Sequence, residues 1–338
     1  MKTVVVPIDP AAPCAEILAE AARVLRSGGL VAFPTETVYG LGANALDAAA
    51  VERIFAAKGR PANNPLIVHI FDAGQVRQVA ADWPESAARL AERLWPGPLT
   101  LVLPKQDSVP NAVTANGPTV AVRVPAHPVA QALLRAADLP IAAPSANRST
   151  ELSPTRAEHV LRGLDGRIDM LLDAGPTSGG IESTVLDLTT ISPRLLRPGP
   201  IGVAELETVI GPLAPVRSLT VAAPNDPQPL RSPGMMPRHY SPRTPLECVA
   251  AGREAERLAQ LLSEQRRIAC VTFADPGAAS VGVRVCVLPS DPAGYAAQLY
   301  AALHELDTAG LDRILVTLPP DTEEWLAVRD RLHRAAHS

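Results

Sequence analysis

The sequence predicts an α/β protein in two parts: a twisted open sheet with flanking helices, followed by a smaller three-layer α/β domain. Three observations support this fold class. Short apolar runs alternate with segments of helical spacing, one proline-dense stretch interrupts the alternation, and the alternation then resumes to the end of the chain. The chain has 338 residues, which favours two domains over one. The predicted boundaries are 1–212, a linker or flap at 213–243, and 244–338.

The N-terminal part is expected to contain strands where apolar residues run together or alternate. These strands are predicted at Val4–Ile8, Leu30–Phe33, Leu66–Phe71, Leu99–Leu103, Val120–Val124, Ile168–Leu172, Ser183–Asp187 and Arg194–Arg197. Helices are predicted at Cys14–Ser27, Asp47–Ala57, Pro128–Ala137 and Arg156–Leu161. Asp47 is the expected N-cap of the second helix, and Gly28-Gly29 is expected to end the first.

The segment from Leu213 to Arg243 is dense in proline and has no periodicity, which is typical of a linker or a functional flap. Regular spacing resumes after it. Strands are predicted at Leu246–Ala250, Ile268–Phe273, Val283–Leu288 and Arg313–Leu318, and helices at Glu254–Gln265, Ala293–Leu306 and Thr322–His333. This order predicts a small parallel, Rossmann-like three-layer domain. It contains neither GxGxxG nor GxxxxGK[ST], and so carries no nucleotide fingerprint of its own.

Composition excludes several classes of protein. With 47% hydrophobic and 20% charged residues, the chain is not expected to be disordered. A net charge of −4 disfavours a general nucleic-acid binder, although a local basic pocket remains compatible with it. The four cysteines include no CxxC pair, which argues against structural zinc. The N-terminal apolar run is too short for a signal peptide and no run approaches a membrane span, so the expected location is the cytoplasm.

Polar residues gather in five clusters that follow predicted elements. The clusters are Phe33–Gly42, Lys58–Leu66 with His69, Thr119–Pro125, Ala142–Asn147 with Ser153–Thr155, and Asp173–Val185 with Arg197. Taken singly, each fits an ordinary turn, helix end, salt bridge, cap or glycine hairpin. What they share is cations, hydroxyls and glycines, which suit the binding of phosphates and an amino acid. No Ser-His-Asp order, GxSxG elbow or HExxH motif is present.

Two of the clusters contain cations that invite a specific hypothesis. Lys58 and Arg60, just after a helix, fit either a polyphosphate clamp or a solvated helix end. Strand alternation places Thr119, Ala121 and Arg123 on one face. A buried arginine there needs an anion, and a substrate carboxylate or a structural salt bridge would serve equally well. In the fourth cluster, Ser153 or Thr155 is expected to cap the next helix.

Seven stretches, in this order, resemble the YrdC-like family, and specifically the long form of threonylcarbamoyl-AMP synthase. They are PTETVYGLG, KGRPANNPLIVH, WPGPLTLVL, VAVRVP, PSAN, SGGIESTVLDL and LRPG, and they cover most of residues 20–200. One set of four residues resembles the family's signature, namely Lys58, Arg60, Ser145 and Asn147. Ser232–Met235 and Arg238–Pro242 resemble the flap of the two-domain form. The small domain after them also resembles that form. The chain departs from the family pattern at Thr150, Ala174 and Met236-Pro237.

This resemblance implies an ATP-using nucleotidyltransferase with an N-terminal YrdC-like catalytic domain. The implied reaction turns L-threonine, bicarbonate and ATP into threonylcarbamoyl-AMP and pyrophosphate, for modification of adenosine beside the anticodon in tRNA. Mg²⁺ is expected on the ATP phosphates and not on dedicated protein ligands. The implied L-threonine contacts are Thr35, His69, Arg123, Ala143 and Ser183. The implied ATP contacts are Lys58, Arg60, Asn64, Thr119, Ser145, Asn147, Ser153, Arg197 and Tyr240, with Lys58 and Arg60 in the catalytic role.

Two other interpretations remain open at this point. The first is an RNA-binding module of the YrdC type, against which the acidic net charge and the flap motif argue. The second is a carbamoyl-transfer module like those of hydrogenase-maturation proteins, although the zinc-finger and acylphosphatase-like segments that accompany it are absent. The expected partners are the tRNA threonylcarbamoyl transferase machinery and, weakly, RNA, with no membrane contact.

Overall fold

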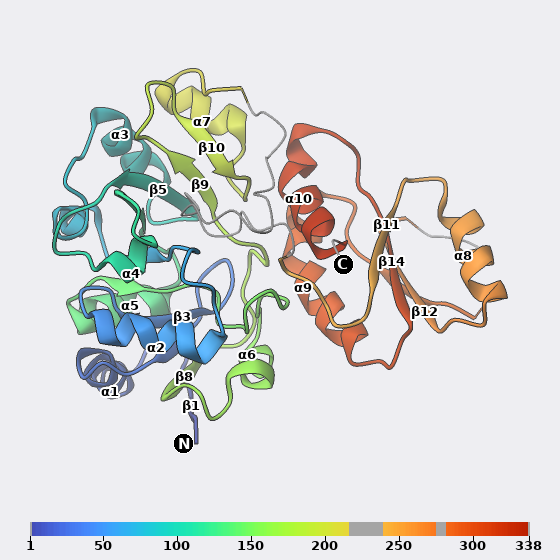
Figure 1. Ribbon diagram of the computed structural model, residues 1–338, viewed down its shortest axis with the longest axis horizontal. Helices are drawn as coiled ribbons and strands as arrows, with labels where there is room; N and C mark the ends of the chain where they lie inside the picture. Colours follow the sequence, from blue (N-terminus) through green and yellow to red (C-terminus); the bar gives the residue numbers. More distant parts are fainter. Residues whose placement is uncertain (1, 216–238, 275–281, 337–338) are drawn as a thin grey trace.

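The computed structural model describes residues 2–215, 239–274 and 282–336, and these form two sheets, one in each part of the chain (Figure 1). Most of the predicted linker, with its Ser232–Met235 and Met236-Pro237 segments, lies outside the described residues. None of the helices described has the length and apolar character needed to cross a membrane.

Within the described residues the first sheet has ten strands, in the order β1-β8-β2-β3-β7-β4-β6-β5-β9-β10. Their bounds are β1 (Val4–Pro7), β2 (Val31–Phe33), β3 (Gly40–Asn44), β4 (Ile67–His69), β5 (Leu99–Pro104), β6 (Thr119–Arg123), β7 (Ile141–Ala142), β8 (Met170–Asp173), β9 (Thr184–Asp187) and β10 (Arg194–Arg197). Neighbours run both parallel and antiparallel, so the sheet is mixed. The open α/β sheet is therefore confirmed, and each of the eight predicted strands has a counterpart.

Two strands were not predicted, and the longer of them, β3, is rich in glycine. Such a stretch normally favours a turn, and that is how the sequence was interpreted. A Cβ atom on Gly42 would lie 2.8 Å from Phe33 Cε1 and 2.9 Å from Ile141 Cγ2. Glycine is therefore needed here because neighbouring side chains on β2 and β7 approach the β3 backbone closely.

The helices cover the two faces of the first sheet unequally. On one face, α1 (Ala15–Arg26) and α5 (Pro128–Ala137) share a core with β2 and β8. A larger core on the other face takes in α2 (Ala48–Lys58), α3 (Glu85–Leu94), α4 (Asn111–Thr114), α6 (Ala157–Leu164), α7 (Val203–Ile210) and the 3₁₀ helix η1 (Ala73–Gln78). Asp47 caps α2 as predicted, accepting from the amides of Ala49 and Ala50.

The predicted cap of α6 is wrong. Its N-cap is Arg156, which makes no side-chain capping bond. The Thr155 amide instead donates to Nδ1 of His159 at 3.3 Å, and the Ser153 hydroxyl donates to the Glu182 carboxylate. Local spacing suggested a capping box, but a carboxylate brought in from a distant loop competes for the serine.

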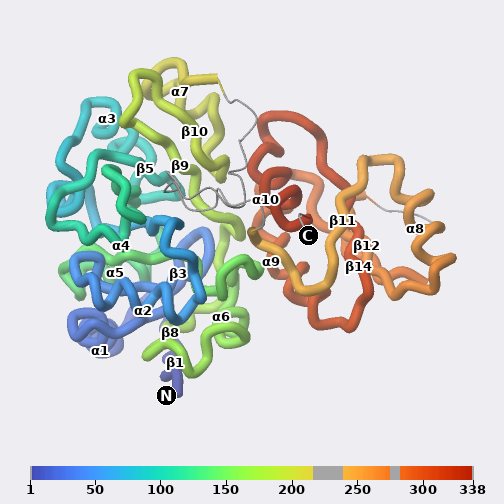
Figure 2. The backbone as a smooth tube through the Cα atoms, in the orientation of Figure 1, coloured from blue at the N-terminus to red at the C-terminus, as the bar shows by residue number. Residues whose placement is uncertain are grey.

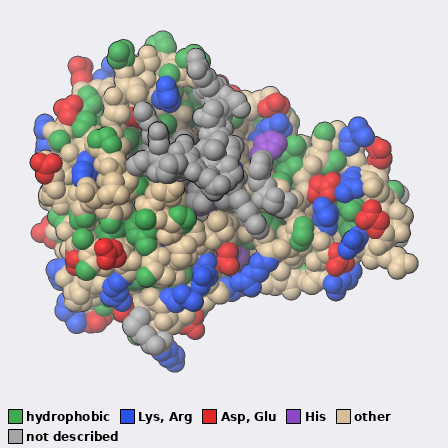
Figure 3. Space-filling view, in the orientation of Figure 1, with side chains coloured by type: hydrophobic (Ala, Val, Ile, Leu, Met, Phe, Trp, Pro, Cys, Tyr) green, Lys and Arg blue, Asp and Glu red, His purple; other side chains and the backbone are tan. Residues whose placement is uncertain are grey.

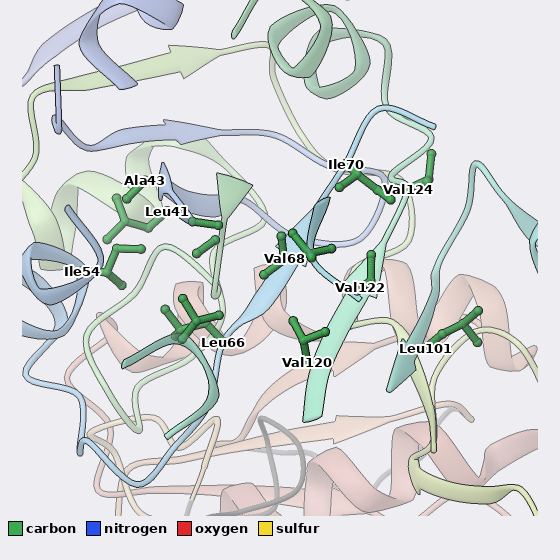
Figure 4. Packing of buried hydrophobic residues seen from close by; sticks show 14 of the residues in the cluster. Leu41, Ala43, Ile54, Leu66, Val68, Ile70, Leu101, Val120, Val122 and Val124 are labelled. Carbon is green, nitrogen blue, oxygen red and sulfur yellow. The ribbon is translucent and has the colours of Figure 1, made fainter. Parts of the chain in front are cut away.

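Strand alternation gives β4, β5 and β6 two different faces. Their core-facing side chains belong to one buried cluster with Leu41, Ile54 and Leu66, and Figure 4 shows Val68, Leu101, Val120 and Val122 within it. On the opposite face Ile67, Val102, Ala121, Val185 and Leu196 form a small separate apolar cluster. His69, Thr100 and Arg123 lie on this same face, because each is two residues from a member of the cluster on its own strand. We call this opposite face of β4, β5, β6, β9 and β10 the site face.

The second sheet has four parallel strands in the order β11-β14-β12-β13 among the residues described. They are β11 (Leu246–Val249), β12 (Ile268–Thr272), β13 (Arg284–Val287) and β14 (Arg313–Thr317). Helix α8 (Glu254–Ser263) packs on one face, whereas α9 (Pro292–Asp307), the 3₁₀ helix η3 (Glu323–Trp325) and α10 (Leu326–Ala336) cover the other. The predicted small three-layer domain is confirmed.

Helices α9 and α10 lie between the two sheets and contact the N-terminal part (Figure 2). The Glu323 carboxylate accepts from the Ala204 amide in the first turn of α7. Arg162 donates to the His304 carbonyl at 3.1 Å, and the rings of His159 and His304 stack with centroids 3.8 Å apart. The C-terminal part therefore packs directly against elements that surround the site face.

Candidate active site

A pocket lies on the site face where the loops after β2 and β7 meet the ends of β4, β6 and β10. Its lining residues are Thr35, Thr37, Val38, Gly40, Arg60, Ile67, His69, Arg123, Ala143, Pro144, Ser145, Glu182, Ser183, Arg197, His239 and Tyr240. All five residues predicted to bind L-threonine are among them. So are four of the predicted ATP contacts, namely Arg60, Ser145, Arg197 and Tyr240.

The remaining predicted ATP contacts lie outside this lining. Lys58, Asn64, Asn147 and Ser153 are buried behind it and hydrogen-bond to lining residues or their neighbours. Thr119 is different: it begins β6, pairs with Pro104 across the sheet, and is separated from Arg123 by the length of the strand. The structure does not bring Thr119 into the pocket.

Arg123 is the central cation of the amino-acid side of the pocket. It is buried, and its guanidinium donates to the Glu36 carboxylate at 2.6 Å, to the Thr37 hydroxyl at 3.1 Å and to the Gly97 carbonyl at 3.2 Å. The Glu36 carboxylate also accepts from the Ala126 amide at 3.0 Å. Of the two anions considered from the sequence, the structure therefore shows a protein carboxylate beside this arginine.

His69 lies directly opposite Arg123 in the parallel pairing of β4 and β6. Burial and then the nearby Arg123 charge lower the pKa of His69 to about 3, so the imidazole is neutral at pH 7. Its Nδ1 is buried and has no hydrogen-bond partner among the described residues. An unpaired buried ring nitrogen that borders a pocket is available to a ligand.

The loop after β2 places hydroxyl groups next to these two side chains. The Thr35 hydroxyl accepts from the amides of Thr37 and Val38, each at 3.2 Å, and donates to the Val38 carbonyl at 2.7 Å. It also lies 2.8 Å from the Thr37 hydroxyl. Thr37, which the sequence analysis did not select, thus connects Thr35 to Arg123.

Ser183 joins the amino-acid side of the pocket to the cationic side. Its hydroxyl lies 2.8 Å from that of Thr100 and accepts from Arg197 Nη2 at 3.1 Å, while its carbonyl accepts from Arg197 Nε at 3.0 Å. Thr100 was also missed. Its signal was available, because alternation along β5 places Thr100 on the site face, and it pairs with Arg123 across the sheet.

Arg60 is held so that part of its guanidinium remains available. Its Nε and Nη2 donate to the Asn64 carbonyl, the Asn64 side-chain oxygen and the Pro65 carbonyl at 2.6–3.0 Å. No hydrogen bond of Nη1 is seen to the residues that the structure describes. Burial, and then the neighbouring Arg197, lower the pKa of Arg60 to about 9, which still leaves it charged at pH 7.

Lys58 holds a loop of the pocket instead of lining it. Its buried ammonium donates to the carbonyls of Ser145 and Asn147 and, at 3.4 Å, to the Asn147 side-chain oxygen. Asn147 in turn accepts from the Ser145 hydroxyl at 2.6 Å and donates to the Glu151 carbonyl at 2.7 Å. Burial and the nearby Arg60 hold the pKa of Lys58 well below its usual range.

Tyr240 lies over the cationic side of the pocket, beyond the undescribed part of the linker. The side chain is buried, and its hydroxyl has no partner among the residues described. The ring makes an edge contact with His239 and lies under the Arg331 guanidinium at 5.2 Å. Burial raises the pKa of Tyr240, so the phenol is protonated at neutral pH.

The described side chains do not form a metal site of their own. No group of three histidine, cysteine, aspartate or glutamate residues is found there with the geometry to hold an ion. The lining includes one carboxylate, Glu182, which already accepts from Ser153 and Arg331. A divalent ion in this pocket would therefore depend on the oxygens of a ligand.

Comparison with known proteins finds relatives over nearly the whole chain. A family model described as "Telomere recombination" matches residues 23–199, and one described as "Threonylcarbamoyl-AMP synthase, C-terminal domain" matches residues 201–337. Threonylcarbamoyl-AMP synthases from Bacillus subtilis and Pyrococcus abyssi are 46% and 44% identical, each over 94% of this chain and 92% and 93% of their own lengths.

Among solved structures, Pyrococcus abyssi Sua5 complexed with L-threonine superposes with a TM-score of 0.90 at 41% identity. The match covers 99% of this chain and 98% of that one. The match therefore spans both sheets of this chain. The chain belongs to the threonylcarbamoyl-AMP synthase family, in the form that joins a YrdC-like part to a C-terminal domain.

Proposed function

We propose that this chain is an L-threonylcarbamoyladenylate synthase, a nucleotidyltransferase that makes threonylcarbamoyl-AMP and pyrophosphate from L-threonine, bicarbonate and ATP. The observation that carries the proposal is one pocket in which a set of residues suited to an amino acid borders a set suited to phosphates. The L-threonine complex of the Pyrococcus abyssi relative supports the same assignment.

L-threonine occupies the side of the pocket formed by Thr35, His69, Arg123, Ala143 and Ser183. Its carboxylate is attracted by the Arg123 guanidinium, which Glu36 keeps in place. The neutral imidazole of His69 supplies a hydrogen-bonding group without adding a second positive charge. The amine must lose its proton to react. The nearby carboxylates are already paired, Glu36 with Arg123 and Glu182 with Arg331, so neither is free to stabilise the ammonium form.

The ATP phosphates occupy the side formed by Arg60, Ser145, Arg197 and Tyr240. Lys58, Asn64 and Asn147 act through them: Asn64 orients Arg60, and Lys58 with Asn147 fixes the loop that carries Ser145. We therefore place Arg60 in direct contact with the reacting phosphates and Lys58 in a positioning role. Thr119 and Ser153 remain proposed ATP contacts on the family resemblance.

The chemistry needs no covalent nucleophile from the protein. The threonine amine adds to the carbon of CO2 with loss of a proton, or to that of bicarbonate with loss of water, and gives a carbamate. A carbamate oxygen then attacks the α-phosphorus of ATP as pyrophosphate leaves. Arg60 and Arg197 stabilise the negative charge on the phosphate oxygens, and the pocket holds the two reactants together. Ser183 contacts Arg197 and belongs to the amino-acid side, so the two reactants meet beside it.

Mg²⁺ enters this scheme as part of the MgATP substrate. The phosphates supply most ligands in such sites, which fits a pocket whose described side chains form no metal cluster. The product is passed to the tRNA threonylcarbamoyl transferase machinery in the cytoplasm, with at most weak direct contact to RNA. Acidic and basic side chains are interspersed on the face drawn in Figure 3, in keeping with a net charge of −4.

Pyrophosphate release tests the proposal directly. The full chain is incubated with MgATP, and L-threonine and bicarbonate are each left out in turn, with the nucleotide product identified by mass. We expect release that requires both compounds and a product of the mass of threonylcarbamoyl-AMP. Release that does not need threonine would disprove the assignment. Inactive Arg60→Ala protein with an unchanged far-ultraviolet spectrum is the matched control for contaminating ATPases.

A further inference from the structure

An arginine of the C-terminal part, Arg331 on α10, is completely buried against the pocket loops of the N-terminal part. Its side chain is 0% exposed. Nε donates to the Glu182 carboxylate at 2.7 Å, and Nη2 donates to the Pro198 carbonyl at 3.0 Å. Nη1 donates to Asp330 of its own helix at 2.7 Å. A single guanidinium thus connects α10 to two separate loops of the pocket.

The groups that Arg331 contacts are next to predicted substrate contacts. Glu182 immediately precedes Ser183, and Pro198 immediately follows Arg197. The guanidinium also lies 5.2 Å from the centre of the Tyr240 ring, within the range of a cation–π contact. Three of the residues expected to hold threonine or ATP are therefore beside groups that this one side chain fixes.

Glu182 extends the contact to a fourth predicted residue. Its Oε1 accepts from the Ser153 hydroxyl, while its Oε2 accepts from Arg331 and, at 3.4 Å, from the Tyr300 hydroxyl of α9. The Ser153 carbonyl is 3.1 Å from Nε2 of His304. Burial lowers the pKa of His304 to about 4, so at pH 7 the ring is neutral and Nε2–H donates. The C-terminal part thus holds the Ser153 carbonyl directly and the Ser153 hydroxyl through Glu182.

The charges of this network balance without a ligand. Arg331 and Arg334 are matched by Glu182 and Asp330, and all four side chains are at most 8% exposed. A buried charge that is paired and hydrogen-bonded in this way is strongly fixed in place. Only the planar fork of an arginine can reach a carboxylate, a backbone carbonyl and an aromatic face together. The arrangement is therefore a preformed frame around the nucleotide side of the pocket.

We infer that Arg331 is a positioning residue for ATP: through Glu182 and Pro198 it holds Ser153, Ser183 and Arg197, with the ring of Tyr240, in their binding arrangement. This assigns the C-terminal part a direct share in building the site. The inference rests on the proposed function for its choice of ATP as ligand. Three of the four residues belong to the predicted ATP set, and Ser183 alone belongs to the threonine set, so ATP binding depends on Arg331 more than threonine binding does.

The test compares Arg331→Gln with the wild-type full chain. Dissociation constants for MgATP and for L-threonine are measured by calorimetry, and KM values by pyrophosphate release. The lost charged hydrogen bonds predict a rise of about tenfold or more in both the Kd and the KM for ATP, with a smaller rise for threonine. The matched control is Arg329→Gln, because Arg329 lies on the same helix but pairs with Asp321 and Pro319 of the C-terminal part.

Several outcomes would overturn the inference. One is an ATP affinity for Arg331→Gln within about twofold of wild type. Another is an equal loss of ATP affinity in Arg329→Gln, which would make the effect one of general destabilisation. If Arg331→Gln does not fold, Arg331→Lys replaces it, since lysine keeps the charge beside Glu182 and loses the fork. Wild-type ATP binding in Arg331→Lys, or failure of both variants to fold, makes the residue purely structural.

Failure of the proposed function is distinguishable from failure of this inference. If wild-type protein releases no pyrophosphate, the reaction is misassigned, and the calorimetric affinities still decide the role of Arg331. If wild-type protein is active and Arg331→Gln binds ATP normally, the function stands and the positioning role is wrong.

Discussion

Arg123 and Glu36 form an ion pair of 2.6 Å at the amino-acid side of the pocket, with side chains 4% and 16% exposed. The same guanidinium reaches the Thr37 hydroxyl and the Gly97 carbonyl, so its plane is fixed by three groups. Such a fixed guanidinium can orient a substrate carboxylate without first becoming ordered itself. The geometry of the arginine, as well as its charge, is therefore expected to matter.

Arg123→Lys should weaken L-threonine binding more than ATP binding. A lysine ammonium is a point charge on a flexible stem and cannot satisfy the three partners of Arg123 at once. We expect a rise of about tenfold in the KM for threonine and little change in the KM for ATP. The control is Arg135→Lys. Arg135 lies on α5 and makes a cation–π contact with Phe71, so this change should alter neither KM. Equal effects on both substrates would contradict the separation of the two sides.

Much of the fold could be predicted because the local spacing of apolar residues indicates most of its helices and strands. The strand and helix pattern of the C-terminal part needed only period-2 and period-3.6 spacing. Strand β3 could not be predicted in the same way. Its glycines indicate a turn by propensity, and the requirement for them arises from Phe33 and Ile141, which only the folded sheet brings to either side of Gly42.

The site shows the same division between local and distant signals. Arg123 was selected from its place on an apolar strand, but its two possible partners were equivalent until Glu36 was located. Arg331 gave no signal at all, because it lies 149 positions from Glu182 and in an ordinary helical pattern. Contacts between parts of the chain that are this far apart depend on how the two sheets dock, which spacing does not encode.

His69 should make the stability of the protein depend on pH in mildly acidic solution. Its pKa is about 3 when folded and about 6.5 when unfolded, so the unfolded state binds the extra proton. Its contribution is therefore fully present above pH 6.5 and is lost as the pH falls toward 3. At pH 5 the loss is about 2 kcal/mol of unfolding free energy. His69→Gln should reduce the difference between urea unfolding at pH 7 and pH 5 by this amount.

The wild-type protein supplies the reference for that measurement, because it keeps His69 together with every other histidine. His159 and His304, whose pKa values are also lowered by burial, are present in both proteins, so the comparison isolates His69. An unchanged pH dependence in His69→Gln would show that this imidazole titrates normally.

Thr150 should be replaceable by glycine with a gain in stability. Its φ is +71°, in the left-handed region that β-branched residues rarely adopt, and its carbonyl accepts from the Ser241 amide at 2.9 Å. The strain of about 1–2 kcal/mol exceeds the entropic cost of glycine, about 0.5–1 kcal/mol. Thr150→Gly should therefore raise the unfolding free energy by up to about 1 kcal/mol. Thr308→Gly, at a φ of −99°, should give no gain, and a loss of stability in Thr150→Gly would contradict the strain.

Tyr240→Phe should separate stability from ATP binding. The Tyr240 hydroxyl is buried and without a partner among the described residues, yet it borders the cationic side of the pocket. Removing an unsatisfied hydroxyl should stabilise the ligand-free protein by about 1 kcal/mol. If ATP supplies the missing partner, the same change should raise the Kd for ATP about three- to tenfold.

Tyr295→Phe provides a matched comparison for Tyr240→Phe. The Tyr295 hydroxyl is also buried and unpartnered among the residues described, but it lies in the core of the C-terminal part against Trp325. Both variants should therefore gain similar stability in thermal unfolding, and only Tyr240→Phe should bind ATP more weakly in calorimetry. Because the two changes remove the same atom from equally buried positions, a difference in ATP affinity can come only from where that atom points. Equal affinities would mean that the Tyr240 hydroxyl does not meet the nucleotide.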